Sequence, residues 1–159
     1  MSIHIRKAVP ADAATIHGFI VELAKYEEAE HEVKASIAEI ESSIFSTDSP
    51  AKALICEIDG TAIGFAVYFY NFSTWQGKKG LYLEDLYISP KHRGFGAGKL
   101  LLRHLAKTAV EEGCGRFEWS VLDWNQPAID FYQSVGAKPQ AEWVKYRMAG
   151  EDLLNFAAQ

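Results

Sequence analysis

Three glycines stand at alternate positions, Gly94, Gly96 and Gly98, where a predicted strand gives way to a predicted helix. Glycine lets the backbone approach a ligand closely and adopt a positive φ angle. The N–H groups at the start of a helix offer donors to an anion, and the helix dipole favours negative charge there. Arg93 and Lys99 add positive charge beside the glycines. This arrangement indicates a loop that binds a pyrophosphate.

Two common pyrophosphate loops do not fit this spacing. The NTPase loop has the pattern Gly-x-x-x-x-Gly-Lys followed by Ser or Thr, but position 93 is Arg93 and position 100 is Leu100. The dinucleotide fingerprint requires a glycine where this chain has Lys99. The pattern that remains is Arg-x-x-Gly-x-Gly, from Arg93 to Gly98. The alternative interpretation is a flexible glycine turn that only starts a helix.

The elements that must position this loop follow from hydrophobic periodicity and turn signals. Asp59-Gly60 between two apolar runs indicates a β-hairpin, and Ser36 with Glu39 forms a capping box at a helix start. In chain order we predict a strand at 3–7, helices at 10–26 and 36–45, strands at 53–58 and 61–70, a loop at 71–80, a strand at 81–88, a helix at 96–112, a strand at 116–122, a helix at 126–135, a strand at 142–148 and a short helix from 150. This order predicts an α/β fold, a mixed sheet covered by helices.

Length and composition limit the possible classes of protein. A chain of 159 residues with 48% hydrophobic and 23% charged residues suits one globular domain, here residues 1–159. The formal charge of −5 disfavours non-specific binding to nucleic acid. No apolar run is long enough to span a bilayer, and the N-terminus lacks a signal pattern. Cys56 and Cys114 are interpreted as free thiols. We therefore expect a cytoplasmic protein without membrane partners. The histidines lack metal-ligand spacing, so no metal is predicted.

Three further blocks, together with the Arg93–Gly98 loop, resemble a known family. They are Glu22-Leu-Ala-Lys-Tyr-Glu, Tyr82-Leu-Glu-Asp, and Asp123-Trp-Asn-Gln-Pro-Ala-Ile-Asp-Phe-Tyr followed by Gly136-Ala. In this order they are similar to the diamine (spermidine/spermine) acetyltransferase branch of the GCN5-related N-acetyltransferase (GNAT) superfamily. The resemblance covers nearly the whole chain. It implies the GNAT fold, a mixed sheet splayed between its fourth and fifth strands, here 81–88 and 116–122, with acetyl-CoA in the gap.

The resemblance also implies a set of site residues. Backbone groups on the fourth strand would pair with the pantetheine arm, the glycine loop would hold the pyrophosphate, and an asparagine and a tyrosine would contact the cofactor, the tyrosine near the thioester sulfur. In this sequence the cofactor residues are Leu86, Tyr87, Ile88, Arg93, Gly94, Phe95, Gly96, Ala97, Gly98, Lys99, Asn125 and Tyr132. Glu84 matches the glutamate that receives the proton of the amine, so Glu84 and Tyr132 are the expected catalytic pair.

Elementary chemistry supports these roles. An alkyl amine with a pKa of about 10.4 arrives protonated and must lose a proton before its nitrogen can attack. A carboxylate such as Glu84 can hold the ammonium and accept or relay the proton, and a tyrosine such as Tyr132 can donate a proton to the leaving thiolate. Strand N–H groups near Tyr87 could stabilise the oxyanion. Because side chains alternate along a regular strand, at most one of Glu84 and Asp85 would face the amine. Both carboxylates could also be surface charge, and Tyr132 could be core.

Candidate contacts for the substrate are Glu84, Asp85, Trp75 and Glu142. The polyamine enzymes carry an acid where this chain has Ser73, and the segments around Trp75 and Asn125 instead resemble sister enzymes that acetylate thialysine. One missing anchor for a distant ammonium predicts a preference for a short substrate, such as thialysine or lysine, over spermine.

Other functions use the same motifs. Acetylation of protein lysines or N-termini would need an open groove for peptide, and a non-catalytic acyl-CoA-binding regulator would not need both Glu84 and Tyr132. The resemblance further implies a homodimer with the active site near its interface, for which Trp143, Tyr146 and Phe156 offer apolar surface. Alternatively, these aromatic residues complete the core of the monomer.

Overall fold

A computed structural model describes residues 2–159 and divides the chain into two units, one up to Ser120 and one at Val121–Gln159. The first unit contains five strands and three α-helices. In chain order these are β1 (Ile3–Lys7), α1 (Ala13–Tyr26), α2 (Ile37–Phe45), β2 (Lys52–Ile58), β3 (Thr61–Ser73), β4 (Lys78–Ile88), α3 (Ala97–Glu111) and β5 (Phe117–Trp119). The single-domain organisation stays a prediction.

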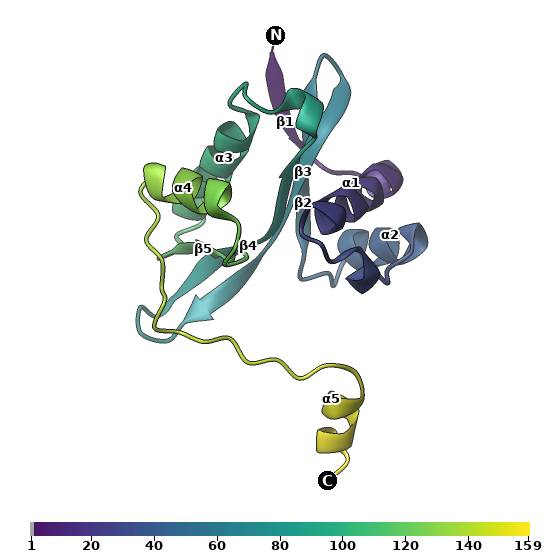
Figure 1. The fold of residues 1–159 in the computed structure, drawn as a ribbon, viewed down its shortest axis with the longest axis vertical. Helices are drawn as coiled ribbons and strands as arrows, with labels where there is room; N and C mark the ends of the chain where they lie inside the picture. The colour runs from purple at the N-terminus through teal and green to yellow at the C-terminus, as the bar shows by residue number, and fades with distance from the viewer. Residues whose placement is uncertain (1) are drawn as a thin grey trace. The chain divides into compact units, whose positions relative to one another are not determined.

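The five strands form one sheet in the order β1-β2-β3-β4-β5. All neighbours are antiparallel except β4 and β5, which are parallel. Figure 1 shows α1 and α2 on one side of the sheet and α3 on the other. The expected mixed sheet flanked by helices is therefore confirmed.

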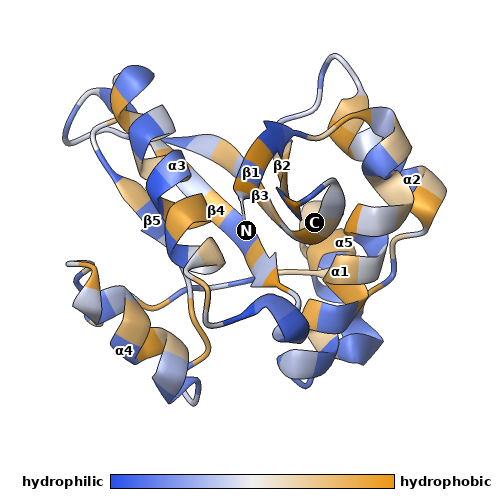
Figure 2. Cartoon of the chain, turned by 90° about the horizontal axis from the view of Figure 1, so that it is seen from above, coloured by the Kyte–Doolittle hydropathy of each residue, from blue (hydrophilic) through white to orange (hydrophobic). Residues whose placement is uncertain are grey.

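The helices pack on the sheet because their apolar residues recur at helical spacing. Ile16 and Phe19 of α1 are buried against Phe65 and Val67 of β3 and Tyr87 of β4. Complete burial of one such side chain contributes about 1.5–3 kcal/mol. In Figure 2, α1 and α3 each carry both hydrophobic and hydrophilic stretches, as expected for helices that cover a sheet.

The segment at 71–80 is largely a strand hairpin, although its polar residues suggested a loop. β3 continues to Ser73, β4 begins at Lys78, and these two residues pair across a short turn. The Ser73 hydroxyl accepts a hydrogen bond from the Gln76 N–H at 3.2 Å, and the Gly77 N–H donates to the Ser73 carbonyl at 2.9 Å. These bonds close the turn tightly, so the strands pair almost to its tip. At the other hairpin the prediction is confirmed, with positive φ angles of 49° at Asp59 and 79° at Gly60.

The sheet opens between β4 and β5. Pairing extends only from Leu81↔Phe117 to Leu83↔Trp119, so β5 is shorter than the predicted strand at 116–122. Beyond Leu83, β4 has no further pairing partner on this side within the described part of the first unit. This is the expected splay between the fourth and fifth strands.

The second unit contains α4 (Gln126–Ser134) and α5 (Gly150–Ala157). The predicted strand at 142–148 is wrong, because residues 137–149 form neither helix nor strand. The alternation of apolar and polar residues there favours an extended chain, but a strand also needs a neighbour for its hydrogen bonds. Within residues 121–159 no other strand exists to provide them.

Candidate active site

The glycine loop has the geometry of an anion-binding helix start. Gly94 and Gly96 have φ angles of +87° and +81°, which disfavour any residue with a side chain. Gly96 is the N-cap of α3, and the Leu100 N–H donates to its carbonyl at 2.9 Å. The N–H groups of residues 97–99 precede this first helical bond, so they are the donors that a helix start offers to an anion.

Gly98 differs from the other two glycines because it lies inside the first turn of α3 and has no positive φ. A Cβ atom added there would meet Ile88 Cγ1 at 3.8 Å, an ordinary contact. The fold itself therefore does not require a glycine at position 98. The absence of a side chain there leaves room for a ligand to approach the backbone.

The open edge of β4 exposes backbone groups on alternate residues. The Ser89 N–H donates to the Ile63 carbonyl at 2.7 Å, so Ser89 points towards β3. Because residues alternate along a strand, Tyr87 also points towards β3, while Leu86 and Ile88 point to the open edge. The predicted pairing of Leu86, Tyr87 and Ile88 with the pantetheine arm stays a prediction, and the backbone groups that face the open edge are those of Leu86 and Ile88.

A β-bulge lies where the sheet opens. Val67 pairs with Asp85 and Tyr68 pairs with Leu83, so Glu84 is an extra residue without a partner on β3. A bulge interrupts strict alternation. The expectation that only one of Glu84 and Asp85 can face the amine therefore does not apply, because it assumed a regular strand.

Asp85 beside the bulge is affected by burial and by neighbouring carboxylates. Burial, reinforced by the charges of Glu84 and Glu27, raises the pKa of Asp85 from 3.8 to about 6. Burial also raises the pKa of Glu27, which follows the last residue of α1. A bound cation would offset this repulsion. The sequence did not indicate Glu27 as a site residue, because only the packing of α1 on the sheet brings it close to β4.

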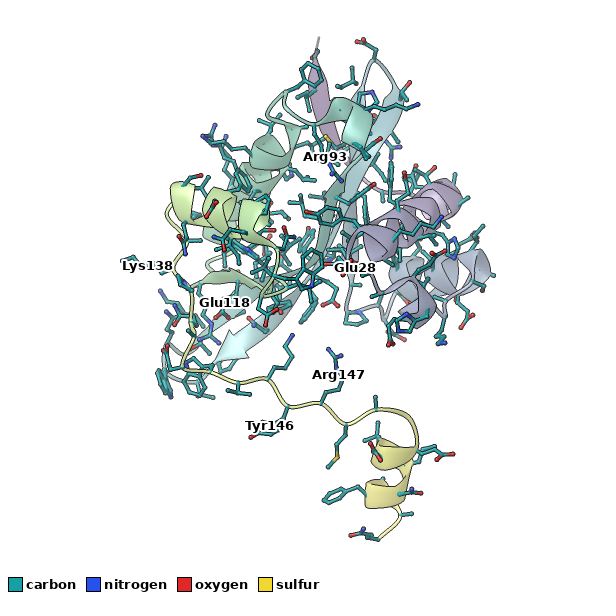
Figure 3. The ribbon with its side chains drawn as sticks, viewed as in Figure 1. Glu28, Arg93, Glu118, Lys138, Tyr146 and Arg147 are labelled. Atoms are coloured by element: carbon teal, nitrogen blue, oxygen red, sulfur yellow. The ribbon has the colours of Figure 1, made fainter. Side chains whose placement is uncertain are left out.

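The Arg93 side chain points back towards the sheet. Its Nε donates to the Ile88 carbonyl at 2.8 Å, and its guanidinium carbon lies 5.3 Å from the ring centroid of Tyr87 and 5.5 Å from that of Tyr26. Figure 3 shows Arg93 beside β4, on the side that faces α1. Its predicted contact with a pyrophosphate stays a prediction.

Two hairpin residues lie away from Glu84. Trp75 is 85% exposed in the turn between β3 and β4, and Ser73 is buried at 3% exposure. Glu84 is six residues along β4 from Lys78, the partner of Ser73. At about 3.4 Å per residue this corresponds to about 20 Å along the strand. A contact between Trp75 and the substrate of Glu84 therefore stays a prediction.

The remaining predicted residues belong to the second unit. Asn125 is buried and caps α4, where its side-chain oxygen accepts a hydrogen bond from the Ala128 N–H at 3.4 Å. Tyr132 is partly buried on α4, with its ring centroid 5.7 Å from that of Phe131. Glu142 is exposed in a turn rather than on the predicted strand.

Within residues 2–159, no cluster of three or more histidine, cysteine or acidic side chains is arranged to hold a metal ion. None of the helices in this range is both long enough and apolar enough to cross a membrane.

Known proteins resemble both the sequence and the structure. Residues 16–137 match the family described as acetyltransferase (GNAT) family. Thialysine N-epsilon-acetyltransferase from Sus scrofa is 33% identical over 99% of both chains. L-ornithine N5-acetyltransferase from Arabidopsis thaliana is 43% identical over 60% of this chain and 42% of its own. An integron cassette protein from V. cholerae superposes with a TM-score of 0.84 at 29% identity, covering 100% of this chain and 99% of its own.

The family match explains the geometry of the first unit. GNAT acetyltransferases use acetyl-CoA, and an anion-binding loop beside an open strand edge suits a long cofactor that carries a pyrophosphate. The chain is an acyltransferase that belongs to the acetyltransferase (GNAT) family, in the branch that includes the thialysine and polyamine acetyltransferases.

Proposed function

We propose that this protein transfers the acetyl group of acetyl-CoA to a primary amine of a small cationic molecule, a lysine-like amino acid such as thialysine or a short polyamine. The observation that carries the proposal is the continuous open edge of β4. This edge begins at the Glu84 bulge, presents backbone groups at Leu86 and Ile88, and leads into the glycine loop.

The bound cofactor would supply an acetyl thioester whose carbonyl carbon can be attacked. The loop of residues 94–99 would hold the pyrophosphate through N–H groups and the dipole of α3. The N–H groups of Leu86 and Ile88 are the strand donors that could stabilise negative charge on the carbonyl oxygen. These residues would bind and orient the thioester.

Glu84 would hold the substrate ammonium and accept its proton before the nitrogen attacks. The new carbon–nitrogen bond forms as the carbon–sulfur bond breaks, and the leaving thiolate would take a proton from Tyr132. The second proton that the nitrogen must lose to become an amide would pass through solvent to the Tyr132 phenolate and restore the phenol. Asn125 would contact the cofactor from the start of α4. The two catalytic roles divide the proton transfers between a carboxylate that accepts and a phenol that donates.

A cationic substrate fits the charge around the bulge. The charges of Glu84 and Glu27 both act on Asp85, so a positive charge beside Asp85 relieves repulsion. A short substrate is proposed because of the relatives to which the chain is similar. The related enzymes named for thialysine and L-ornithine have substrates of this short type.

The test is release of free thiol from acetyl-CoA in the presence of thialysine, lysine, ornithine, spermidine, spermine and lysine peptides. We expect turnover with a short diamine-like amino acid and lower kcat/KM with spermine. Glu84→Gln should shift the activity profile to higher pH, because the amine must then lose its proton to solvent, whereas Glu111→Gln on the exposed side of α3 should not. Faster turnover of peptides or spermine would refute the substrate class.

We also propose a homodimer, supported by the exposed aromatic side chains Trp143 and Tyr146 in the second unit. Light scattering should give a mass of about twice 17.7 kDa at micromolar concentration. A mass near the monomer value would refute it.

A further inference from the structure

Arg93 begins the glycine loop, yet its side chain points back to β4 and α1. The Nε–H donates to the Ile88 carbonyl at 2.8 Å. The guanidinium carbon lies within cation–π range of two rings, at 5.3 Å from the centroid of Tyr87 and 5.5 Å from that of Tyr26. One planar cation thus contacts the end of β4 and the end of α1.

These contacts connect a buried side chain with a more exposed one. Tyr87 is 5% exposed and belongs to the core cluster with Phe19, so its ring is held firmly. Tyr26 is the last residue of α1 and is 43% exposed. Arg93 therefore joins the exposed last residue of α1 to the core at the point where the loop begins.

The position of this helix end matters for the carboxylates at the bulge. Glu27 follows Tyr26 directly, and its charge reaches Asp85 on β4. A displacement of Tyr26 would move Glu27 with it. The end of α1 is thus a link between the cofactor loop and the place where a cationic amine would bind.

We propose that Arg93 is a positioning residue, whose guanidinium, held by the Ile88 carbonyl and the rings of Tyr26 and Tyr87, fixes the end of α1 and thereby Glu27 beside the amine site. The proposal rests on the proposed function for the identity of that site. It differs from a role of Arg93 as a charge for the pyrophosphate, because it assigns the side chain to the fold around the acceptor.

Substitution by lysine separates the two roles. Lysine keeps the positive charge but loses the planar guanidinium and its Nε donor. A residue that only supplied charge to a phosphate would tolerate lysine well. A residue that must contact two rings and a carbonyl at once would not.

The experiment compares Arg93→Lys, Arg93→Gln, Tyr26→Leu and Tyr26→Phe, with Arg103→Gln on the exposed side of α3 as the control. Calorimetry measures the Kd for acetyl-CoA, and steady-state kinetics measures KM for thialysine. We expect Arg93→Lys and Tyr26→Leu each to raise the KM for thialysine about 5- to 10-fold, equivalent to about 1–1.4 kcal/mol. The Kd for acetyl-CoA should change by no more than about twofold in Tyr26→Leu, and Tyr26→Phe, which keeps the ring, should raise KM much less than Tyr26→Leu.

Coupling between the two residues gives a readout without substrate. Arg93→Lys and Tyr26→Leu should each lower Tm, and the double variant should lower it by less than the sum, because both changes remove the same contact. Wild-type protein that acetylates no amine would refute the proposed function, while this cycle would still test the contact. Additive changes in Tm would overturn the proposal. It would also be overturned if Arg93→Lys had the wild-type KM for thialysine while Arg93→Gln lost acetyl-CoA binding. A KM for thialysine in Tyr26→Phe equal to that in Tyr26→Leu would likewise overturn it.

Discussion

Replacing Asp85 by asparagine should stabilise the protein at neutral and alkaline pH while weakening binding of the amine. Asp85 lies beside the β4 bulge, where burial and the charges of Glu84 and Glu27 raise its pKa from 3.8 to about 6. The native fold therefore disfavours the ionised carboxylate. Asparagine has a similar shape and carries no charge that must be desolvated.

The magnitude follows from the pKa difference. The raised pKa means that the folded chain keeps a proton that the unfolded chain has already released between about pH 4 and pH 6. The contribution of Asp85 to stability is thus greatest at low pH and falls as the pH rises through this window. At 1.36 kcal/mol for each pKa unit, the full loss is about 3 kcal/mol. Solvent near the half-buried carboxylate screens part of it, so we expect about 1–2 kcal/mol.

Thermal unfolding at pH 4 and pH 8 measures this effect. For a chain of this size, 1 kcal/mol corresponds to a Tm change of about 2–4 °C. Asp85→Asn should raise Tm at pH 8 by about 2–8 °C and have little effect at pH 4. Asp48→Asn, on an exposed loop, serves as the control and should leave Tm unchanged at both pH values. An equal effect of Asp85→Asn at the two pH values, or destabilisation at pH 8, would show that Asp85 is not strained by its environment.

The same variant tests the functional assignment. A charge-assisted hydrogen bond contributes about 1.5–3 kcal/mol, so its loss should raise KM for a cationic amine roughly 10- to 100-fold. A variant that gains stability and keeps an unchanged KM would mean that Asp85 does not contact the substrate.

Three further predictions concern the loop, the tyrosine and the hairpin. Gly96→Val should abolish acetyl-CoA binding in a folded protein, because its φ of +81° excludes a branched side chain. Unchanged affinity in a calorimetric titration would refute the loop assignment. Gly98→Val tests whether a side chain blocks the approach of the ligand to the backbone, without the strain of a positive φ. Tyr132→Phe should lower kcat by about 10²–10⁴-fold with little change in cofactor affinity, and a near-normal kcat would leave Tyr132 as packing only. Ser73→Asp should lower Tm by at least about 2–4 °C, because it places a carboxylate at a position with 3% exposure, whereas an unaltered Tm would contradict the buried position.

The position of Ser73 in the structure changes the basis of the substrate prediction. In the sequence, Ser73 looked like a missing anchor for a distant ammonium. In the structure its hydroxyl closes the hairpin turn by accepting a hydrogen bond from the Gln76 N–H. The preference for a short substrate therefore rests on the similarity to enzymes named for thialysine and L-ornithine. A ratio of kcat/KM for thialysine and spermine that favours spermine would contradict it.

The sequence by itself determined the order of the principal strands and helices and the loop between β4 and α3. Hydrophobic periodicity and turn residues are local signals, so the hairpin at Asp59 and Gly60 and the capping box at Ser36 could be predicted without any knowledge of tertiary contacts. The same local reasoning identified the glycines at 94 and 96, whose positive φ angles are a property of the backbone at those positions. The resemblance to one family supplied the chemistry that these elements serve.

Tertiary structure alone decided the register of the strands and which residues lie beside the site residues. The bulge at Glu84 depends on how β4 pairs with β3, and the short β5 depends on where β4 turns away from it. The absent strand at 142–148 shows the same limit, since extended backbone becomes a strand only beside a partner. Likewise Arg93 meets Tyr26, and Glu27 influences Asp85, because helix packing brings together residues that lie far apart along the chain. Local sequence patterns do not predict such contacts, because the contacts depend on how whole helices and strands are arranged in space.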